Sequence, residues 1–374
     1  MANPLQQQID ARRREIQTEG YPMSIGELVN LYKDRELDIH PEFQRFFRWS
    51  PNQKSRFIES LLLGIPIPSI FVYQRRDGVW DVIDGLQRLS TVFEFMGELR
   101  DEGGRIVEPS TLVATEYLPG LAGVRWGAWE DTDNHLSGEQ QRLIKRAAID
   151  IKIVRRESDE STKFDLFERL NTGGSQLSDQ EVRNCLLIMA RPEYYRWLIR
   201  LNDYNAFQST VAVSDRAASE QYDLELVLRF LLIKDLSDEE LREIGDMSDF
   251  LNTGSIASAR AASDTEALET SAFENTFGFI ADTVGEWAFR RYDATKGRFL
   301  GGFSVSAYEA VTAGIYANLD AWRGLPPNDR TPRFTELLKE MWLDPDFRDN
   351  SGSGVRASTR IPKVIPYGRA HFVP

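Results

Sequence analysis

The sequence predicts an α+β protein in which a small mixed sheet with helices is followed by an all-helical domain. Short apolar or alternating runs, typical of strands, end near residue 157, and beyond Ser158 nearly every segment repeats its apolar residues at helical spacing. The chain has 374 residues, more than a usual single domain. We therefore divide it into residues 1–23 (a helix or tail), 24–157 (the sheet domain), 158–350 (the helical domain) and 351–374 (a basic tail).

Composition excludes several classes of protein. Hydrophobic residues make up 41% and charged residues 28%, which is ordinary for a globular protein. The net charge of −13 argues against coating nucleic acid by bulk attraction, so any such contact needs a local basic patch. The single cysteine, Cys185, excludes an internal disulfide and a Cys-rich zinc site. Without a signal peptide or a bilayer-length apolar run, we expect a cytoplasmic protein with no membrane partner.

Start and stop signals delimit the elements of the first domain. Residues 4–20 are polar and predict an exposed helix, or a tail that orders on a partner. Two helices begin at capping boxes, Ser24 with Glu27 and Ser50 with Gln53, and the second helix stops at Gly64. The expected strands are 37–39, 69–74, 79–83 and 148–154, with a hairpin turn at 75–78 and a long irregular excursion over 101–135.

Helical spacing dominates the rest of the chain. The segments that show it include 164–170, 181–189, 222–233, 272–289, 307–319 and 334–342. The segment 351–374 lacks acidic residues and carries Arg356, Arg360, Lys363 and Arg369. We interpret these four side chains as a candidate local patch for contact with DNA.

The strongest candidate site lies within residues 82–92. An apolar run ends at Asp84-Gly85, and helical spacing begins at Leu86. Glycine permits a tight turn, and the first-turn N–H groups and dipole of a helix favour an anion. Gln87 and Arg88 add donors and a positive charge to that turn, so the junction is a candidate phosphate cradle. A purely structural pair between Asp84 and an arginine is the competing interpretation.

A second polar stretch precedes the helix that starts at Ser50. Gln44, Arg45, Arg48 and Trp49 lie there. Arginine forks suit phosphate oxygens, and a tryptophan can stack on a base. The alternative is that these residues cement the sheet to the next helix.

A third stretch joins two predicted helices. The first helix ends in Asn171-Thr172-Gly173-Gly174, and the next begins at Ser178 with Glu181 three places on. Asn and Gly at a helix end are ordinary C-capping residues. The functional alternative is a polar loop whose Asn171 and backbone groups complete a pocket formed by the other two stretches.

In this order, the three stretches resemble the N-terminal domain of the GmrS/GmrD-type modification-dependent restriction proteins, which belongs to the ParB/sulfiredoxin-like superfamily. The family signature, Asp-Gly-Gln-Gln-Arg, stands here as Asp84-Gly85-Leu86-Gln87-Arg88. The other matching motifs are Gln44-Arg45, Arg48-Trp49-Ser50, Gly64-Ile65-Pro66-Ile67-Pro68 and Phe167-x-Arg169-x-Asn171-x-Gly173-Gly174 with Leu177 and Glu181. The resemblance covers about residues 24–190. Leu86 replaces the first glutamine, so any hydrogen bond made by that side chain in relatives is absent here.

The resemblance implies a ParB/sulfiredoxin-like domain that binds and hydrolyses nucleoside triphosphates, coupled to the sensing of invading DNA. It implies catalytic roles for Asp84, Gln87 and Arg88. The implied nucleotide contacts are Gln44, Arg45, Arg48, Trp49, Gly85, Arg88, Ser90, Thr91, Asn171, Gly173 and Gly174. Asp84 is also a candidate ligand for Mg²⁺. The expected cofactor is therefore a nucleoside triphosphate, with its base unassigned, together with Mg²⁺.

Three functions stay open. The favoured one is a nucleotide-hydrolysing sensor or regulatory subunit of a bacterial anti-phage defence system. It would act with a separate nuclease subunit, because no His-rich metal motif follows residue 190. The second is a ParB-like metal-dependent DNA nuclease, for which Asp84 alone is thin evidence. The third is a scaffold with a degenerate pocket, suggested by Leu86. A homo-oligomer is compatible with all three.

Overall fold

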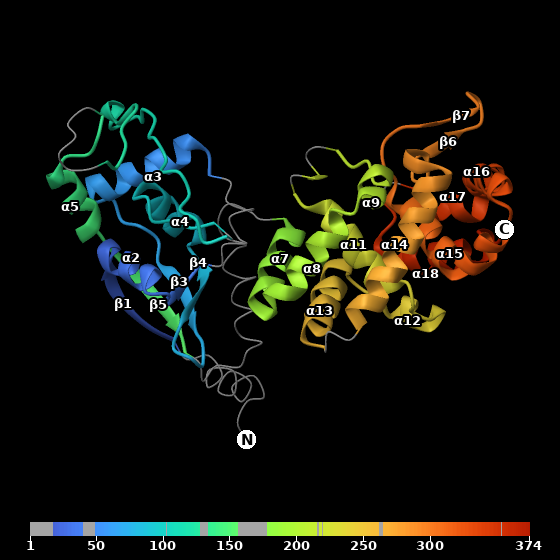
Figure 1. The fold of residues 1–374 in the computed structure, drawn as a ribbon, viewed down its shortest axis with the longest axis horizontal. Coiled ribbons are helices and arrows are strands. Elements are labelled where there is room, and N and C mark those ends of the chain that lie inside the picture. Colours follow the sequence, from blue (N-terminus) through green and yellow to red (C-terminus); the bar gives the residue numbers. More distant parts are fainter. Residues whose placement is uncertain are drawn as a thin grey trace, which may run out of the picture. The chain divides into compact units, whose positions relative to one another are not determined.

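The computed structural model describes residues 18–39, 49–101, 103–127, 134–155, 178–214, 217–218, 220–261, 265–352 and 354–374. The chain folds as two compact units, Met1–Gln176 and Leu177–Pro374 (Figure 1). The predicted boundary near 157 and the predicted helix 164–170 lie outside the described residues.

A mixed five-stranded sheet forms the base of the first unit, which confirms the α+β prediction. Its strands are β1 (Thr18–Ser24), β2 (Leu37–Asp38), β3 (Ile70–Gln74), β4 (Trp80–Asp84) and β5 (Ala148–Val154), in the order β1-β5-β3-β4-β2. The β1/β5 and β3/β4 pairs are antiparallel, and the β3/β5 and β2/β4 pairs are parallel. The predicted hairpin is present, since β3 and β4 pair and the N–H of Arg75 donates to the carbonyl oxygen of Val79 at 2.8 Å.

Four helices pack with this sheet around one hydrophobic core (Figure 1). They are α2 (Ile25–Lys33), α3 (Pro51–Leu63), α4 (Leu86–Phe95) and α5 (Gly138–Arg146), with a short 3₁₀ turn η2 (Pro119–Leu121). In β5, Ile149, Ile151 and Ile153 are buried whereas Ala148 and Asp150 are exposed. Alternation of this kind places these three isoleucines on the face of the sheet that contacts the hydrophobic core.

The predicted residues 1–23 do not form a single tail. Residues 18–24 form β1, which pairs with β5 from Thr18 opposite Val154 to Ser24 opposite Ala148. Sequence patterning missed this strand because Glu19, Gly20 and Tyr21 are exposed and show no apolar alternation. Backbone hydrogen bonds to β5, rather than side-chain burial, define this edge strand.

The second unit is rich in helices, as predicted. Its helices are α7 (Asp179–Ala190), α8 (Pro192–Asn202), α9 (Asn205–Thr210), α11 (Tyr222–Ile233), α12 (Asp238–Glu243), α13 (Met247–Arg260), α14 (Glu266–Thr283), α15 (Val305–Gly324), α16 (Pro327–Leu343), α17 (Pro345–Ser351) and α18 (Ala357–His371). A 3₁₀ turn, η4 (Gly285–Trp287), follows α14 and leads into a small hairpin of β6 (Arg291–Asp293) and β7 (Arg298–Leu300). This hairpin is an addition to the expected all-helical pattern. None of the described helices combines the length and apolar character required to cross a bilayer.

The expected basic tail is a packed helix. Residues 357–371 form α18, which lies against α15. The two helices meet at glycines: a Cβ at Gly368 would lie 2.1 Å from the carbonyl oxygen of Ala310, and one at Gly314 would lie 2.4 Å from that of Gly368. Only glycine permits this backbone approach. The segment therefore belongs to the core of the second unit.

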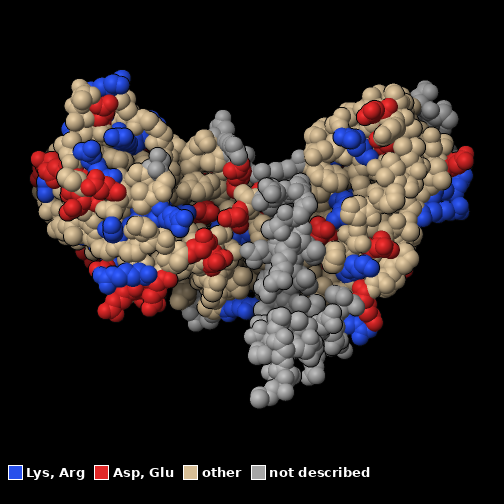
Figure 2. All heavy atoms as spheres, turned by 180° about the vertical axis from the view of Figure 1, so that it is seen from behind, with Lys and Arg blue, Asp and Glu red and all other residues tan. Residues whose placement is uncertain are grey.

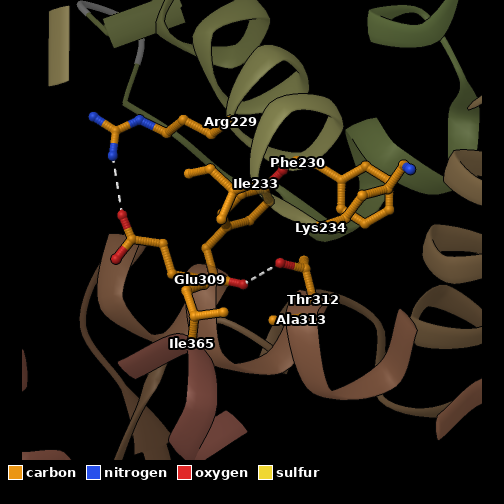
Figure 3. Close-up of a pocket in the computed structure, with 9 residues that line it drawn as sticks. Arg229, Phe230, Ile233, Lys234, Glu309, Thr312, Ala313 and Ile365 are labelled. Atoms are coloured by element: carbon orange, nitrogen blue, oxygen red, sulfur yellow. Dashed lines mark hydrogen bonds and ion pairs between the residues drawn. The ribbon is translucent and has the colours of Figure 1, made fainter. Parts of the chain in front are cut away.

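A buried cluster of charges joins three helices of the second unit, and Figure 3 shows one of its pairs, Arg229 with Glu309. Glu309 of α15 accepts from Arg229 of α11 at 3.0 Å, and from Arg360 of α18 at 2.7 and 2.9 Å. Arg229 also donates to Glu225 at 2.8 and 3.0 Å. Burial lowers the pKa of Arg229, but the two carboxylates more than offset this and raise it overall. Pairing thus keeps Arg229 ionised inside the unit.

Candidate functional site

The junction between β4 and α4 has the geometry predicted from the sequence. The strand ends at Asp84, the helix begins at Leu86, and Gly85 between them has φ 103° and ψ 9°. A Cβ at Gly85 would lie 2.7 Å from Cγ1 of Ile70, so conformation and packing both require glycine. Gly85, the N-cap residue, provides no side-chain hydrogen bond to the first turn of α4. A helix N-terminus of this kind favours an anion.

Arg88 is held in place by acceptors of its own unit. Its Nη2 donates to Oδ2 of Asp84 at 2.7 Å. Its Nη1 donates to the carbonyl oxygen of Ser69 at 3.0 Å, and also to that of Pro68. The side chain of Arg88 is 12% exposed, and that of Asp84 is 29% exposed. Arg88 therefore ties α4 to the end of β4 and to the segment that leads into β3.

This geometry supports the structural interpretation of the pair without testing a phosphate role. A guanidinium has five N–H donors in a rigid fork. The contacts to Asp84, Ser69 and Pro68 use the two terminal nitrogens of Arg88, and Nε takes no part in them. An anion that reached the junction would meet an ordered cation with donor capacity remaining.

Ser90 and Thr91 lie on the buried side of α4. Both residues are 0% exposed, and Oγ1 of Thr91 donates to the carbonyl oxygen of Gln87 at 2.7 Å. That these side chains contact a nucleotide stays a prediction, and a ligand would have to reach them inside the unit. The helical period that leaves Gln87 and Arg88 half-buried near the strand end turns Ser90 and Thr91 into the interior.

Leu86 and Trp49 pack at the edge of the hydrophobic core. The ring of Trp49 meets that of Phe57 edge-on, with 5.5 Å between the ring centroids. Packing of Trp49 against the core favours the interpretation in which this residue is structural. The apolar side chain of Leu86, at the position of the family glutamine, also lies against the core.

The other predicted contacts lie outside the described residues. They are Gln44, Arg45 and Arg48, which precede α3, and Asn171, Gly173 and Gly174, which precede α7. Their convergence with Gly85 and Arg88 on one cleft stays a prediction.

Asp84 stays a predicted Mg²⁺ ligand. Among the described residues, no group of three or more His, Cys, Asp or Glu side chains gathers in a way that could hold a metal. The carboxylate of Asp84 is bonded to Arg88 through Oδ2. Proteins often hold Mg²⁺ through one or two carboxylates together with substrate phosphates, so Asp84 fits such a site only if phosphates supply the other ligands.

Ion pairs of Lys54 and of Arg75 in the first unit were not predicted from the sequence. Nζ of Lys54 in α3 lies 2.6 Å from Oε2 of Glu94 in α4, and these side chains are 17% and 11% exposed. Arg75 binds both Asp38 and the buried Asp81. Burial lowers the pKa of Arg75, but bonds to these two aspartates more than compensate and raise it. Partners 40 residues apart, as in the first pair, have no local sequence signal.

The fold leaves only some of the four basic side chains of the predicted DNA patch exposed. Arg360 is 8% exposed and bonded to Glu309. Arg369 donates to the carbonyl oxygen of Lys234 at 3.0 Å and lies 3.6 Å from Asp238. Arg356 and Lys363 are exposed. Basic and acidic side chains are intermixed over the face drawn in Figure 2. The proposed four-residue patch is thus corrected, because Arg360 is an interior residue.

Comparison with known families identifies a domain that includes most of the first unit and the start of the second. Residues 25–188 match the family described as GmrSD restriction endonuclease, N-terminal domain. Residues 25–188 are a GmrSD-type N-terminal domain. The match spans the junction and confirms the resemblance inferred from the ordered motifs. The GmrSD-type domain relates the chain to restriction-type systems.

A search of solved structures found a Pnob8-like ParB-N domain. It is 12% identical, with 90% of this chain and 96% of that chain covered, and the TM-score is 0.27. A score this low does not establish a common fold. No curated protein matches the chain. The assignment of residues 25–188 to the GmrSD-type family therefore depends on the family match and not on similarity to a solved structure.

Proposed function

We propose that the chain is a nucleoside-triphosphate-binding and -hydrolysing sensor of a bacterial restriction-type defence system. A separately encoded nuclease would be its effector. The observation that carries this proposal is the β4–Gly85–α4 junction inside a GmrSD-type domain, where Arg88 is fixed beside an uncapped helix N-terminus. First-turn amides, the helix dipole and a guanidinium together favour phosphate.

Each residue of the junction has a proposed role. Gly85, with φ 103°, lets the chain turn directly from β4 into α4, so that first-turn N–H groups of the helix lie at the end of the strand, where they could bind phosphate oxygens. Arg88 would donate charge-assisted hydrogen bonds to phosphate. Asp84 would orient Arg88 and, with phosphates present, would hold Mg²⁺. Gln87, in the same turn, would add a hydrogen bond to the nucleotide or to the attacking water.

A specific observation favours a binding scaffold as the second candidate. Leu86 packs against the core in place of the family glutamine, and Arg88 is already bonded to Asp84. A pocket that lacks one polar side chain, and whose arginine is already paired within the protein, can keep its shape while it loses the ability to hydrolyse a nucleotide. Such a scaffold would bind a nucleotide without turning it over, or would bind only a protein or DNA.

Titration calorimetry of the full chain with each nucleoside triphosphate, with and without Mg²⁺, tests the proposal. We expect one triphosphate to bind and to be hydrolysed, and we expect no cleavage of plasmid DNA with Mg²⁺ or Mn²⁺. Binding without hydrolysis would favour the scaffold. Metal-dependent nicking that disappears in Asp84→Ala would establish the nuclease instead.

Arg88→Ala should weaken nucleotide binding by about 1.5–3 kcal/mol, roughly ten- to a hundredfold, because a charge-assisted hydrogen bond to phosphate is lost. Arg88→Lys should recover only part of the affinity, since a point charge cannot reproduce the fork. Leu86→Gln should bind equally well or better. Affinity by calorimetry and melting temperature should be measured for all three variants.

Arg75→Ala is the matched control for Arg88→Ala. It removes an arginine that is also paired with aspartates of the same unit, but at the hairpin end of β3 and β4. The control should lower the melting temperature and leave affinity near wild type. If Arg88→Ala behaves in the same way, its role is structural and the phosphate assignment is lost.

A further inference from the structure

A groove in the second unit, remote in sequence from the β4–α4 junction, carries an unexplained aromatic surface. It lies between the end of α14, η4, the β6–β7 hairpin and α16, and encloses about 1480 Å³ including space open to solvent. Figure 1 shows the hairpin beside α14 and α16 at the edge of this unit. The pairing of β6 with β7 sets Tyr292 opposite Phe299 and so fixes both rings on the groove wall.

Three aromatic rings follow one another along this wall. Phe299 lies between Tyr292, at 5.2 Å between centroids, and Trp287, at 6.5 Å. Trp287 is 44% exposed, and the other two rings are half-buried. A hairpin of two three-residue strands needs no exposed indole for its own packing. A run of accessible π-faces is the feature on which successive unpaired bases stack.

Cations are interleaved with these rings. The guanidinium of Arg290 lies 5.2 Å from the centroid of Trp287, and Nζ of Lys339 lies 5.7 Å from that of Tyr292. Arg290 is paired with Glu286 at 2.6 Å. For Lys339 and the exposed Arg298, the described residues include no carboxylate within ion-pair distance. Within the described residues, these two cations are therefore able to pair with phosphates of a ligand.

The nearest hairpin carboxylate is used within the turn. Asp293 accepts from the N–H of Thr295 at 2.9 Å, from its hydroxyl at 2.6 Å, and from the N–H of Lys296 at 3.2 Å. Side-chain bonding to Thr295, despite a smaller opposing effect of desolvation, lowers the pKa of Asp293. This carboxylate stabilises the turn and keeps its negative charge, and because Asp293 is the register partner of Arg298 it offsets part of the positive charge on that side of the hairpin.

We propose that this groove binds single-stranded nucleic acid, with bases stacked on Trp287 and Phe299 and backbone phosphates on Arg298 and Lys339. An acidic peptide would satisfy the cations but would leave the accessible rings unused. Duplex DNA would hide its bases from stacking. The proposal is separate from nucleotide binding at Arg88, and a chain that fails to bind a triphosphate could still have this site.

Fluorescence anisotropy of labelled dT and rU oligomers with the full chain tests the groove, and the two arms tell DNA from RNA. Trp287→Ala should weaken binding by about 5- to 150-fold, which corresponds to loss of one stacked base. Trp287→Phe keeps a π-face and should retain most of the affinity. Arg298→Ala and Lys339→Ala should each reduce the slope of log affinity against log salt by about 0.7.

Matched controls lie away from the groove. Tyr117→Ala removes a ring that is 67% exposed in the other unit, and Arg242→Ala removes an exposed cation of α12. Both should bind like the wild type. The proposal is overturned if the wild type binds neither oligomer, if a duplex binds as tightly as the single strand, or if Trp287→Ala and Lys339→Ala match the controls.

Discussion

Replacing Glu309 with alanine should lower the stability of the second unit by about 3–5 kcal/mol, the usual effect of breaking a buried ion pair. Glu309 is 2% exposed and binds Arg229 and Arg360 at once. Its loss leaves Arg360 without its carboxylate partner and Arg229 with Glu225 alone. Buried guanidinium groups cannot shed their charge at ordinary pH, so the whole desolvation penalty remains.

The rate at which a thiol reagent labels Cys185 reports how often the second unit unfolds in this variant. Cys185 is the single cysteine, 2% exposed in α7 of the same unit, and burial, aided by Glu181, raises the pKa of its thiol well above the ordinary value. A thiol reagent should therefore label the native wild-type chain slowly and the unfolded chain fast. Glu309→Ala should label faster at every urea concentration below the wild-type transition.

Glu336→Ala is the control for Glu309→Ala. Glu336 lies on the surface of α16, where its carboxylate meets Arg333 at 2.8 Å and its side chain is 60% exposed. We expect a change below about 0.5–1 kcal/mol, as for most surface pairs. If Glu309→Ala and Glu336→Ala label Cys185 at the same rate, the buried cluster does not stabilise the unit.

Gly85→Ala should destabilise the first unit by about 2–5 kcal/mol, the sum of backbone strain and overpacking. Gly85 has φ 103°, and an added Cβ would lie 2.7 Å from Cγ1 and 3.2 Å from Cγ2 of Ile70. Ile70 is 0% exposed, so it has little room to move away. Hydrogen exchange of peptides covering β3, β4 and α4 should become faster.

The variant Gly78→Ala separates the effect of backbone strain from that of overpacking against Ile70. Gly78 has φ 91° in the β3–β4 turn, but nothing lies within 4 Å of its added Cβ. This variant therefore reports backbone strain alone, about 1–2 kcal/mol. The excess in Gly85→Ala is the effect of the contact with Ile70. Equal exchange rates in the two variants would show that Ile70 adapts and that close packing does not require glycine at position 85.

Helix caps, helix ends and amphipathic helices could be predicted from the sequence, because they depend on residues that are close together in the chain. Ser50 and Gln53 form the predicted reciprocal box, at 2.9 and 3.3 Å, and Gly64 ends α3 with φ 69°. The predicted helix 222–233 is α11. Caps and turns need only a few adjacent residues, and a buried helical face repeats along the sequence, so both leave a pattern that can be recognised.

Elements without such a pattern were missed. β1 has exposed residues over most of its length and exists through pairing with β5. The β6–β7 hairpin has two strands of three residues, too short for alternation to be distinct. The predicted basic tail is α18, because Gly314 and Gly368 allow α15 and α18 to touch. For β1 and α18, a contact between residues far apart in sequence decides the outcome.

By itself, the sequence determined the two-part organisation, the elements around Gly85 and the relation to GmrSD-type domains. The tertiary structure alone decided the partners of the charged side chains: Arg88 with Asp84, and Glu309 with Arg229 and Arg360. It also decided that Ser90 and Thr91 face inward. The reason is physical. Helix period and capping arise within a few residues, whereas the environment of a charge depends on which distant helices pack around it.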